Sequence, residues 1–567
     1  MQMSLRRLPR CGLVAAALAA ALAIAPLARA DERSCCAPTS TVPGSEEQGW
    51  TMTVEELAKL GEVSFPISCN AAAQRAFVQG VAMLHSFWFE EAGRAFARVA
   101  AADPSCAMAH WGVAMSLYHP LWAPPTNEML ARGAAEVEKA KAAGGKTARE
   151  ADYIAAIGAF YKDWSTRYHA QRAGAYLKAM EQVHRTYPKD TEAALFYALS
   201  LISNASSFDK KLIDQHKAGE IAEKIFAAQP EHPGAAHYII HAYDYPELAS
   251  RALPAARRYA RIAPSVPHAL HMPSHTFTQV GAWQESIESN RASMAAAKAY
   301  GMRTLMKGAW EEQLHAMDYL EYAYLQLGRD GEAQAIVREL AAIRESTPEK
   351  SRKSAYAFDA IPARYAIERR RWAEAAALEP RPGPFPRAAA LSYFARGYAR
   401  ARLGDLAGAR ADLALLADTR ERLEAKSDEG INAASFVEVQ RLAVAAWLAH
   451  AEKRDDEALK LMRAAAQLED NTDDGPITPG PIVRARELLG ELLLELGQPR
   501  AALVEFKAAL ATAPLRFNGV FGAARAAQKL GNRAQLAAFQ RQLDALCSPS
   551  DCDRPELAEL KTSPNRP

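Results

Sequence analysis

A recurring spacing of glycine, alanine, phenylalanine and proline constrains this chain more than any other feature. Near the end of the chain it runs through Gly490, Gly497, Ala502, Phe506 and Pro514, at intervals of 7, 5, 4 and 8 residues. Near the start it runs through Gly80, Ala92, Phe96 and Pro104, at intervals of 12, 4 and 8 residues. Recurrence of this kind indicates an array of units, each of which buries its apolar face against its neighbours.

The spacing predicts a pair of helices in each unit. A small residue within the first helix lets the second helix approach closely, and a glycine ends the first helix because it adopts left-handed backbone angles without penalty. Proline then stops the second helix. The turn recurs at Gly328 to Ala333, at Gly404 to Ala409 and, with a serine, at Gly281 to Ser286. We therefore expect an all-α chain of helical hairpins, with fewer than about one residue in twenty in strands.

This pattern resembles the tetratricopeptide repeat family, whose period is about 34 residues. The resemblance covers most of residues 71–545 and implies a solenoid that coils into a right-handed superhelix. It is weakest at about 121–190, where we expect an extra helical stretch. The family holds peptides or partner proteins in a concave groove lined by first helices, so the resemblance implies a protein or peptide partner.

The ends of the chain differ from the repeats. Residues 1–30 combine early arginines, an apolar run and the small-x-small site Ala28-Arg29-Ala30, which predicts a cleaved export signal. We expect a periplasmic or extracellular protein without stable membrane insertion, whose mature chain begins near Asp31; N-terminal sequencing checks this. Residues 31–70 are expected to form a tail and lead-in, and residues 546–567 a C-terminal tail.

Charge and cysteines narrow the possibilities further. The 68 Lys and Arg residues nearly balance the 66 Asp and Glu residues, so no basic face for nucleic acid is expected. An even number of cysteines remains after the predicted signal, which permits disulfides in an exported chain. Cys547 and Cys552 are expected to close a loop behind the last helix, and Cys69 and Cys106 can join the first repeat to the segment before it.

Histidines recur in register with the repeats. Pro233, His237 and His241 are followed 34 residues later by Pro267, His271 and His275. A shift of 47 residues, which is the distance between the turn glycines Gly281 and Gly328, relates further members of the set. This shift takes His268 to His315, His271 to Asp318 and His275 to Tyr322.

Residues at i and i+4 share one helix face, and packed helices lie about 8–10 Å apart, so these histidines can converge. We expect His237, His241, His271 and His275 to form one site, with His268, His315 and Asp318 at its edge. A nitrogen-rich set suits zinc, copper or iron. Two alternatives stay open: the histidines contact a partner, or each is a structural residue hydrogen-bonded within the core.

Aromatic residues near the start form a second candidate site. His85, Trp88, His110 and Trp111, with Tyr322, are expected to line the partner groove, although aromatic residues at helical spacing more often fill a core. The chain also resembles secreted bacterial tetratricopeptide proteins of unassigned activity, through Ala109-His110-Trp111-Gly112 and His271-Met272-Pro273-Ser274-His275. The leading hypothesis is an exported scaffold for a protein or peptide; the alternative is a metal-binding protein or metalloenzyme.

Overall fold

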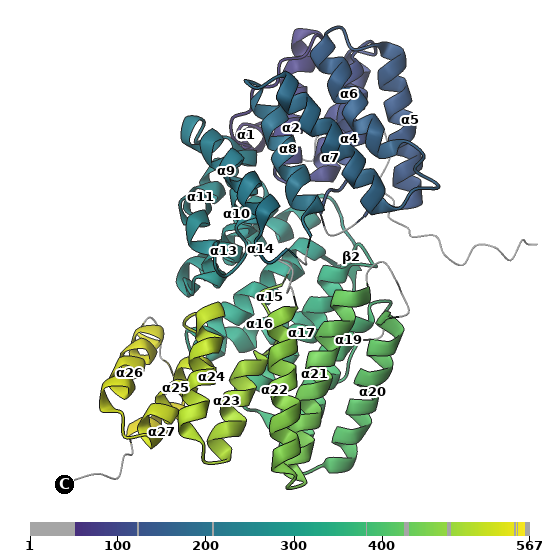
Figure 1. The fold of residues 1–567 in the computed structure, drawn as a ribbon. Helices are drawn as coiled ribbons and strands as arrows, with labels where there is room; N and C mark the ends of the chain where they lie inside the picture. The colour runs from purple at the N-terminus through teal and green to yellow at the C-terminus, as the bar shows by residue number, and fades with distance from the viewer. Residues whose placement is uncertain are drawn as a thin grey trace, which may run out of the picture. The chain divides into compact units, whose positions relative to one another are not determined.

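The computed structural model describes residues 52–121, 124–206, 209–381, 383–424, 430–472, 478–548, 552 and 554–561. The predicted export signal and the tail before residue 52 lie outside these ranges. Residues Gly44–Pro567 form one compact unit. Within the described residues this unit is built almost entirely from α-helices that follow one another as antiparallel neighbours (Figure 1).

The helices before the histidine-rich region are α1 (Val54–Leu57), α2 (Ala71–His85), α3 (Phe89–Ala102), α4 (Ala107–Ser116), α5 (Asn127–Ala143), α6 (Ala148–Tyr161), α7 (His169–Thr186), α8 (Thr191–Asn204) and α9 (Ile213–Ala228). The next are α10 (Pro233–Ala242), α11 (Ala249–Ile262), α12 (Pro267–His271), α13 (Pro273–Gln279), α14 (Trp283–Arg303), α15 (Glu311–Gln326) and α16 (Asp330–Ala342).

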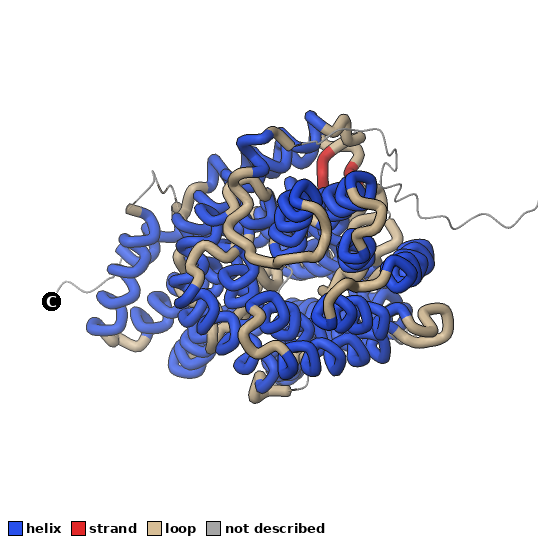
Figure 2. Tube along the Cα trace, turned by 90° about the horizontal axis from the view of Figure 1, so that it is seen from above, coloured by secondary structure: helices blue, strands red, loops and turns tan. Residues whose placement is uncertain are grey.

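The remaining helices are α17 (Arg352–Glu368), α18 (Trp372–Ala376), α19 (Pro386–Leu403), α20 (Leu406–Glu424), α21 (Gly430–Ala451), α22 (Asp455–Asn471), α23 (Ala485–Glu495), α24 (Pro499–Thr512), α25 (Phe517–Lys529), α26 (Arg533–Cys547) and α27 (Glu556–Lys561). The described strands are β1 (Ala309–Trp310) and β2 (Ser346–Thr347), which pair in parallel and are drawn in red in Figure 2. The expectation of helical hairpins with few strand residues is therefore confirmed for the described residues.

Close packing of glycine on phenylalanine explains the repeated spacing. A Cβ added to Gly80 would lie 2.7 Å from the Phe96 ring, and one added to Gly112 would lie 2.2 Å from the same ring. The C-terminal repeats show the same arrangement, since Phe506 lies between Gly490 and Gly522, where an added Cβ would approach within 2.8 and 2.3 Å. In both units the phenylalanine of the second helix thus fits between glycines of two flanking helices.

The turn glycines adopt the conformation that the sequence predicts. Gly281, Gly328, Gly404 and Gly497 all have positive φ, between 66 and 81°. The equivalent turn between α2 and α3 is an exception, because Phe87 occupies it with φ 55°. A bulky residue seldom adopts this conformation, which costs about 1–2 kcal/mol. Phe87 therefore marks a turn where a ring is retained at an energetic cost.

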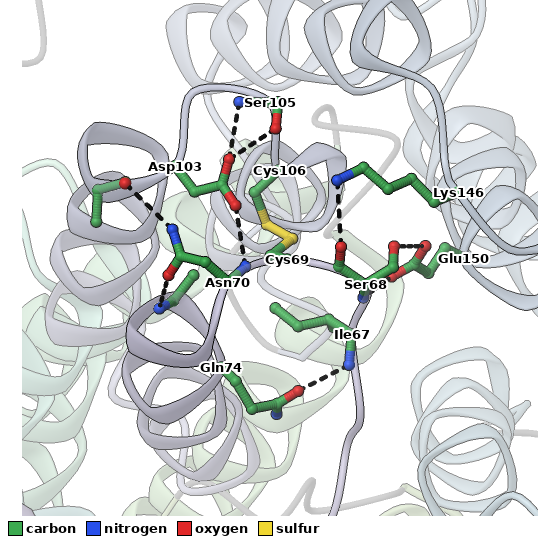
Figure 3. The surroundings of a disulfide bond; sticks show 12 residues. Ile67, Ser68, Cys69, Asn70, Gln74, Asp103, Ser105, Cys106, Lys146 and Glu150 are labelled. Carbon is green, nitrogen blue, oxygen red and sulfur yellow. Dashed lines mark hydrogen bonds between the residues drawn. A yellow bond between two sulfur atoms is a disulfide. The ribbon is translucent and has the colours of Figure 1, made fainter.

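Two disulfides tie the ends of the array. Cys69 bonds Cys106 across 37 residues, so that the segment before α2 is joined to the N-terminus of α4 (Figure 3). Next to this disulfide, the backbone N–H of Asn70 donates to the Asp103 carboxylate at 3.0 Å. Cys547 bonds Cys552 behind α26. Both pairings agree with those expected from the sequence.

Helices α5, α6 and α7 lie within residues 121–190, where the sequence resemblance to the repeats is degenerate. Helix α2 begins at Ala71, and α26 ends at Cys547. Across the described residues, we find no helix with the length and apolar character needed to span a membrane.

Candidate metal centre

Helices α10, α12, α13 and α15 carry the histidine register. Pro233 and Pro267 occupy the first turns of α10 and α12, where a missing N–H has no cost. Pro273 begins α13 directly after α12, and Met272 between them keeps right-handed helical angles. The chain direction therefore continues from α12 into α13, so His271 and His275 face one another across the junction.

The structure divides the predicted cluster into two neighbouring triads. In each triad, one ligand nitrogen from every ring lies within 4.8 Å of the others. Triad A is His237, His241 and His268, and triad B is His271, His275 and His315. The single site expected from His237, His241, His271 and His275 is thus corrected. The registers hold, but the ring nitrogens gather in two sets, one from α10 and α12 and one from α12, α13 and α15.

Triad B has defined ring orientations. The His271 Nδ1 lies 2.7 Å from the Asn290 side-chain oxygen, and the Asn290 amide nitrogen donates to the Ser286 carbonyl at 2.8 Å. The His275 Nδ1 lies 2.7 Å from the Asp244 carboxylate. Both Nδ1 atoms therefore carry the ring proton and donate it in a hydrogen bond. Each Nε2 atom is then unprotonated and has a lone pair available to bind a cation. The two Nε2 atoms lie 3.0 Å apart.

Triad A lies beside it. The His237 Nδ1 donates to the His85 carbonyl at 2.6 Å, and its Nε2 has no hydrogen-bond partner among the described residues. The His268 Nδ1 lies 3.5 Å from the Glu312 carboxylate. His237 is fully buried, and His241 and His268 are 2% and 7% exposed. Triad A therefore presents buried ring nitrogens to a common point.

Burial favours the neutral form of four of these imidazoles. It lowers the pKa of His271 well below the ordinary value of 6.5, and the neighbouring histidines lower it further. Burial and histidine neighbours act in the same direction on the pKa of His237 and His241. Burial first, and then Lys353, lowers the pKa of His315. Neutral imidazole is the form that binds a metal ion.

Asp318 does not lie at the edge of the cluster, which corrects the sequence expectation. Its carboxylate accepts a hydrogen bond from Arg364 at 2.7 Å, on α17. Tyr319, the next residue, packs against triad B instead. Its ring centroid lies 4.9 Å from that of His271 and 5.0 Å from that of His275. The ion pair with Arg364 stabilises this buried carboxylate of Asp318 away from the histidines.

Three contacts were missed in the sequence. Asp244 and Asn290 carry no repeat signature, since one lies in the turn after α10 and the other on α14. Tyr319 follows His315 by four residues, the same spacing that separates His237 from His241 and His271 from His275. That spacing is the signal that could have found Tyr319.

The aromatic residues proposed for a partner groove are mainly core residues. Trp88, Trp111 and Tyr322 are 3%, 1% and 4% exposed. Trp111 packs edge-on against Phe65 at 5.4 Å. His110 is partly buried, and its Nδ1 lies 2.7 Å from Glu136. These residues thus correct the groove expectation, because aromatic rings at helical spacing fill the space between helices.

His85 belongs to a third buried cluster. Its Nε2 lies 2.6 Å from one oxygen of Glu192, and the Nε2 of His232 lies 3.0 Å from the other. The His85 Nδ1 lies 2.9 Å from the Tyr238 hydroxyl, which can donate to it. This cluster differs from the triads because two histidines share one carboxylate, although its three ligand atoms also lie within 4.8 Å of one another and the His232 Nδ1 has no hydrogen-bond partner among the described residues.

No protein-family model and no curated protein matches this chain. Solved structures with some likeness include the human IFIT1 dimer with m7Gppp-AAAA, at 12% identity and TM-score 0.37, covering 78% of this chain and 90% of that one. A monomeric IFIT1 mutant with Gppp-AAAA has 11% identity and TM-score 0.37, covering 87% of this chain and 99% of that one. Likeness this distant says nothing about a ligand of this chain.

Proposed function

We propose that this protein binds a transition-metal ion through His271, His275 and His315. The observation that carries the proposal is the 3.0 Å approach of the His271 and His275 Nε2 atoms. Both rings have their proton on Nδ1, since both Nδ1 atoms lie on hydrogen-bond acceptors. Two lone pairs facing at this distance repel unless a cation lies between or beside them.

The spacing suits a metal ion. Two nitrogens bound tetrahedrally to one ion at about 2.0–2.1 Å stand about 3.3 Å apart. His315 supplies the third nitrogen, and its ring centroid lies 4.3 Å from that of His271. The ligand set has imidazoles and no thiolate, which suits zinc and copper better than magnesium or calcium.

The hydrogen-bond partners of these imidazole rings resemble those of metal-binding histidines in other proteins. Histidines that bind metals usually donate their second ring nitrogen to a carboxylate, amide or carbonyl, which fixes the tautomer. Asp244 holds His275 in this way, and Asn290 holds His271. A proton shared between the two Nε2 atoms is the competing occupant, and metal analysis of the protein distinguishes it from a metal ion.

Metal content after dialysis against a weak chelator tests the proposal. His315→Ala is the informative variant, because His315 is 5% exposed and its removal leaves the His271–His275 pair intact. We expect it to lose the ion from triad B. His184→Ala is the control, since His184 stacks on Tyr197 outside the centre. Equal metal content in the wild type and His315→Ala, with both folded by circular dichroism, would refute the proposal.

Export and partner binding remain separate predictions. The Cys69–Cys106 disulfide is compatible with an oxidising compartment. A groove lined by Trp88 and Trp111 is not part of the proposal, because both side chains are buried. The array is instead proposed as the frame that holds the histidines, with any protein or peptide partner bound elsewhere on it.

A further inference from the structure

We infer that His237, His241 and His268 bind a second ion beside the first, so that the centre holds two transition-metal ions. This inference rests on the proposed function. It requires a complete set of ligands in triad A, separate from triad B. It also requires that the two sets be close enough to act as one centre.

Triad A is complete by itself. Its three ligand nitrogens lie within 4.8 Å of one another, as do those of triad B. They come from α10 and α12, whereas triad B comes from α12, α13 and α15. No histidine has to serve both sets. Two ions can therefore be bound without competing for a ligand.

His237 shows the preparation expected of a metal ligand. Its Nδ1 donates to the His85 carbonyl at 2.6 Å, which leaves the lone pair on Nε2. That Nε2 is buried without a hydrogen-bond partner among the residues described. A buried acceptor without a partner is unfavourable, and a metal ion bound at Nε2 would satisfy it.

Aromatic rings pack against triad A. Phe87 lies over it, with ring centroids 4.4 Å from His237, 5.4 Å from His241 and 5.7 Å from His268. The Tyr259 ring stacks on that of His237, with centroids 5.0 Å apart. These contacts hold the three imidazoles within a packed aromatic surrounding.

The two triads are neighbours. The ring centroids of His241 and His275 lie 6.4 Å apart, and those of His268 and His271 lie 6.3 Å apart. Rings of the two sets thus contact one another without an intervening layer of protein.

Metal stoichiometry tests the inference, with cobalt(II) or zinc(II) alone as the probe. We expect two ions per chain in the wild type and one in His268→Ala. We also expect one ion per chain in His315→Ala, and none in the variant that carries both His268→Ala and His315→Ala. His268 is the suitable target in triad A because it is 7% exposed, the most accessible of the three. His184→Ala serves as control and should keep two ions.

The outcomes separate this inference from the proposed function. One ion in the wild type and in His268→Ala, with none in His315→Ala, would leave the proposed function intact and overturn the second site. One ion that both variants lose would mean a single shared site, which also overturns it. No ion in the wild type would overturn both. The wild-type count is decisive even if a variant fails to fold.

Copper(II) provides a second measurement on the wild type. Two copper(II) ions in adjacent triads should couple magnetically. The paramagnetic resonance signal per copper should therefore fall or broaden between one and two equivalents. A signal that grows linearly to two equivalents, with no change in shape, would contradict the proximity of the two ions.

Discussion

At the scale of single residues, Glu192 shows how a charge is kept in the interior of this protein. Its carboxylate is fully buried, with one imidazole on each oxygen. Burial by itself would raise the pKa of Glu192, but the interactions with His85 and His232 outweigh it and lower the pKa to about 2. The folded state therefore stabilises the ionised form of Glu192 relative to the unfolded chain.

Glu192→Gln should destabilise the protein by about 3 kcal/mol at pH 7, because it breaks a buried charged network. The pKa of the group is lower in the folded state than the ordinary value of 4.5. Its contribution is thus present above pH 4.5 and lost as the pH falls towards 2. Urea unfolding at pH 7 and pH 3 measures the effect. A difference between variant and wild type that does not shrink on acidification would show that charge is not the cause.

At the scale of elements, the fit of Phe96 between Gly80 and Gly112 sets how closely α2, α3 and α4 approach. An added Cβ on Gly112 would lie 2.2 Å from the phenyl ring, which is closer than any real contact. The ring is fully buried and is packed against Phe77 and Trp111 as well. It has little room to move away.

Gly112→Ala should therefore destabilise the protein by about 1–3 kcal/mol, as overpacking of a core does. Gly331→Ala is the matched control, because Gly331 lies in α16 and an added Cβ would meet nothing within 4 Å. The control should be neutral or stabilising by up to about 1 kcal/mol, since alanine favours helix. Thermal unfolding of both variants decides this; equal effects would show that backbone propensity, and not packing, governs the position.

At the scale of the whole molecule, Arg516 connects helices that are distant in sequence. Its guanidinium donates to the Tyr322 hydroxyl at 2.7 Å, to Glu487 at 3.0 Å and to Glu368. Tyr322 lies on α15, Glu368 ends α17 and Glu487 lies on α23. Close by, the Phe517 amide donates to Gln326 of α15 at 2.9 Å. The C-terminal repeats are thus joined to the helix that carries His315.

Arg516→Ala should destabilise the protein by about 3–5 kcal/mol, because it leaves two carboxylates buried without their partner. Arg500→Ala is the control, because Arg500 is exposed on α24. This variant should change stability by less than about 0.5 kcal/mol. Chemical denaturation monitored by circular dichroism gives both values. A similar small effect for the two variants would show that the connection adds nothing to stability.

Much of this protein was determined by the sequence alone. The spacing of Gly490 and Phe506 predicted helical hairpins because glycine and proline act on the backbone locally. The 34-residue shift between His237 and His271 predicted that histidines recur on successive helices. Spacing along one helix fixes which residues share its face, and no tertiary contact can change that relation.

Only the tertiary structure decided how those faces meet. It divided the histidines into two triads, because the distance between rings depends on how neighbouring helices pack and not on repeat register. It turned Asp318 towards Arg364, and it supplied Asp244 and Asn290 from segments outside the register. It also buried Trp88 and Trp111, since a residue on a helix face becomes core or surface according to what packs against that face.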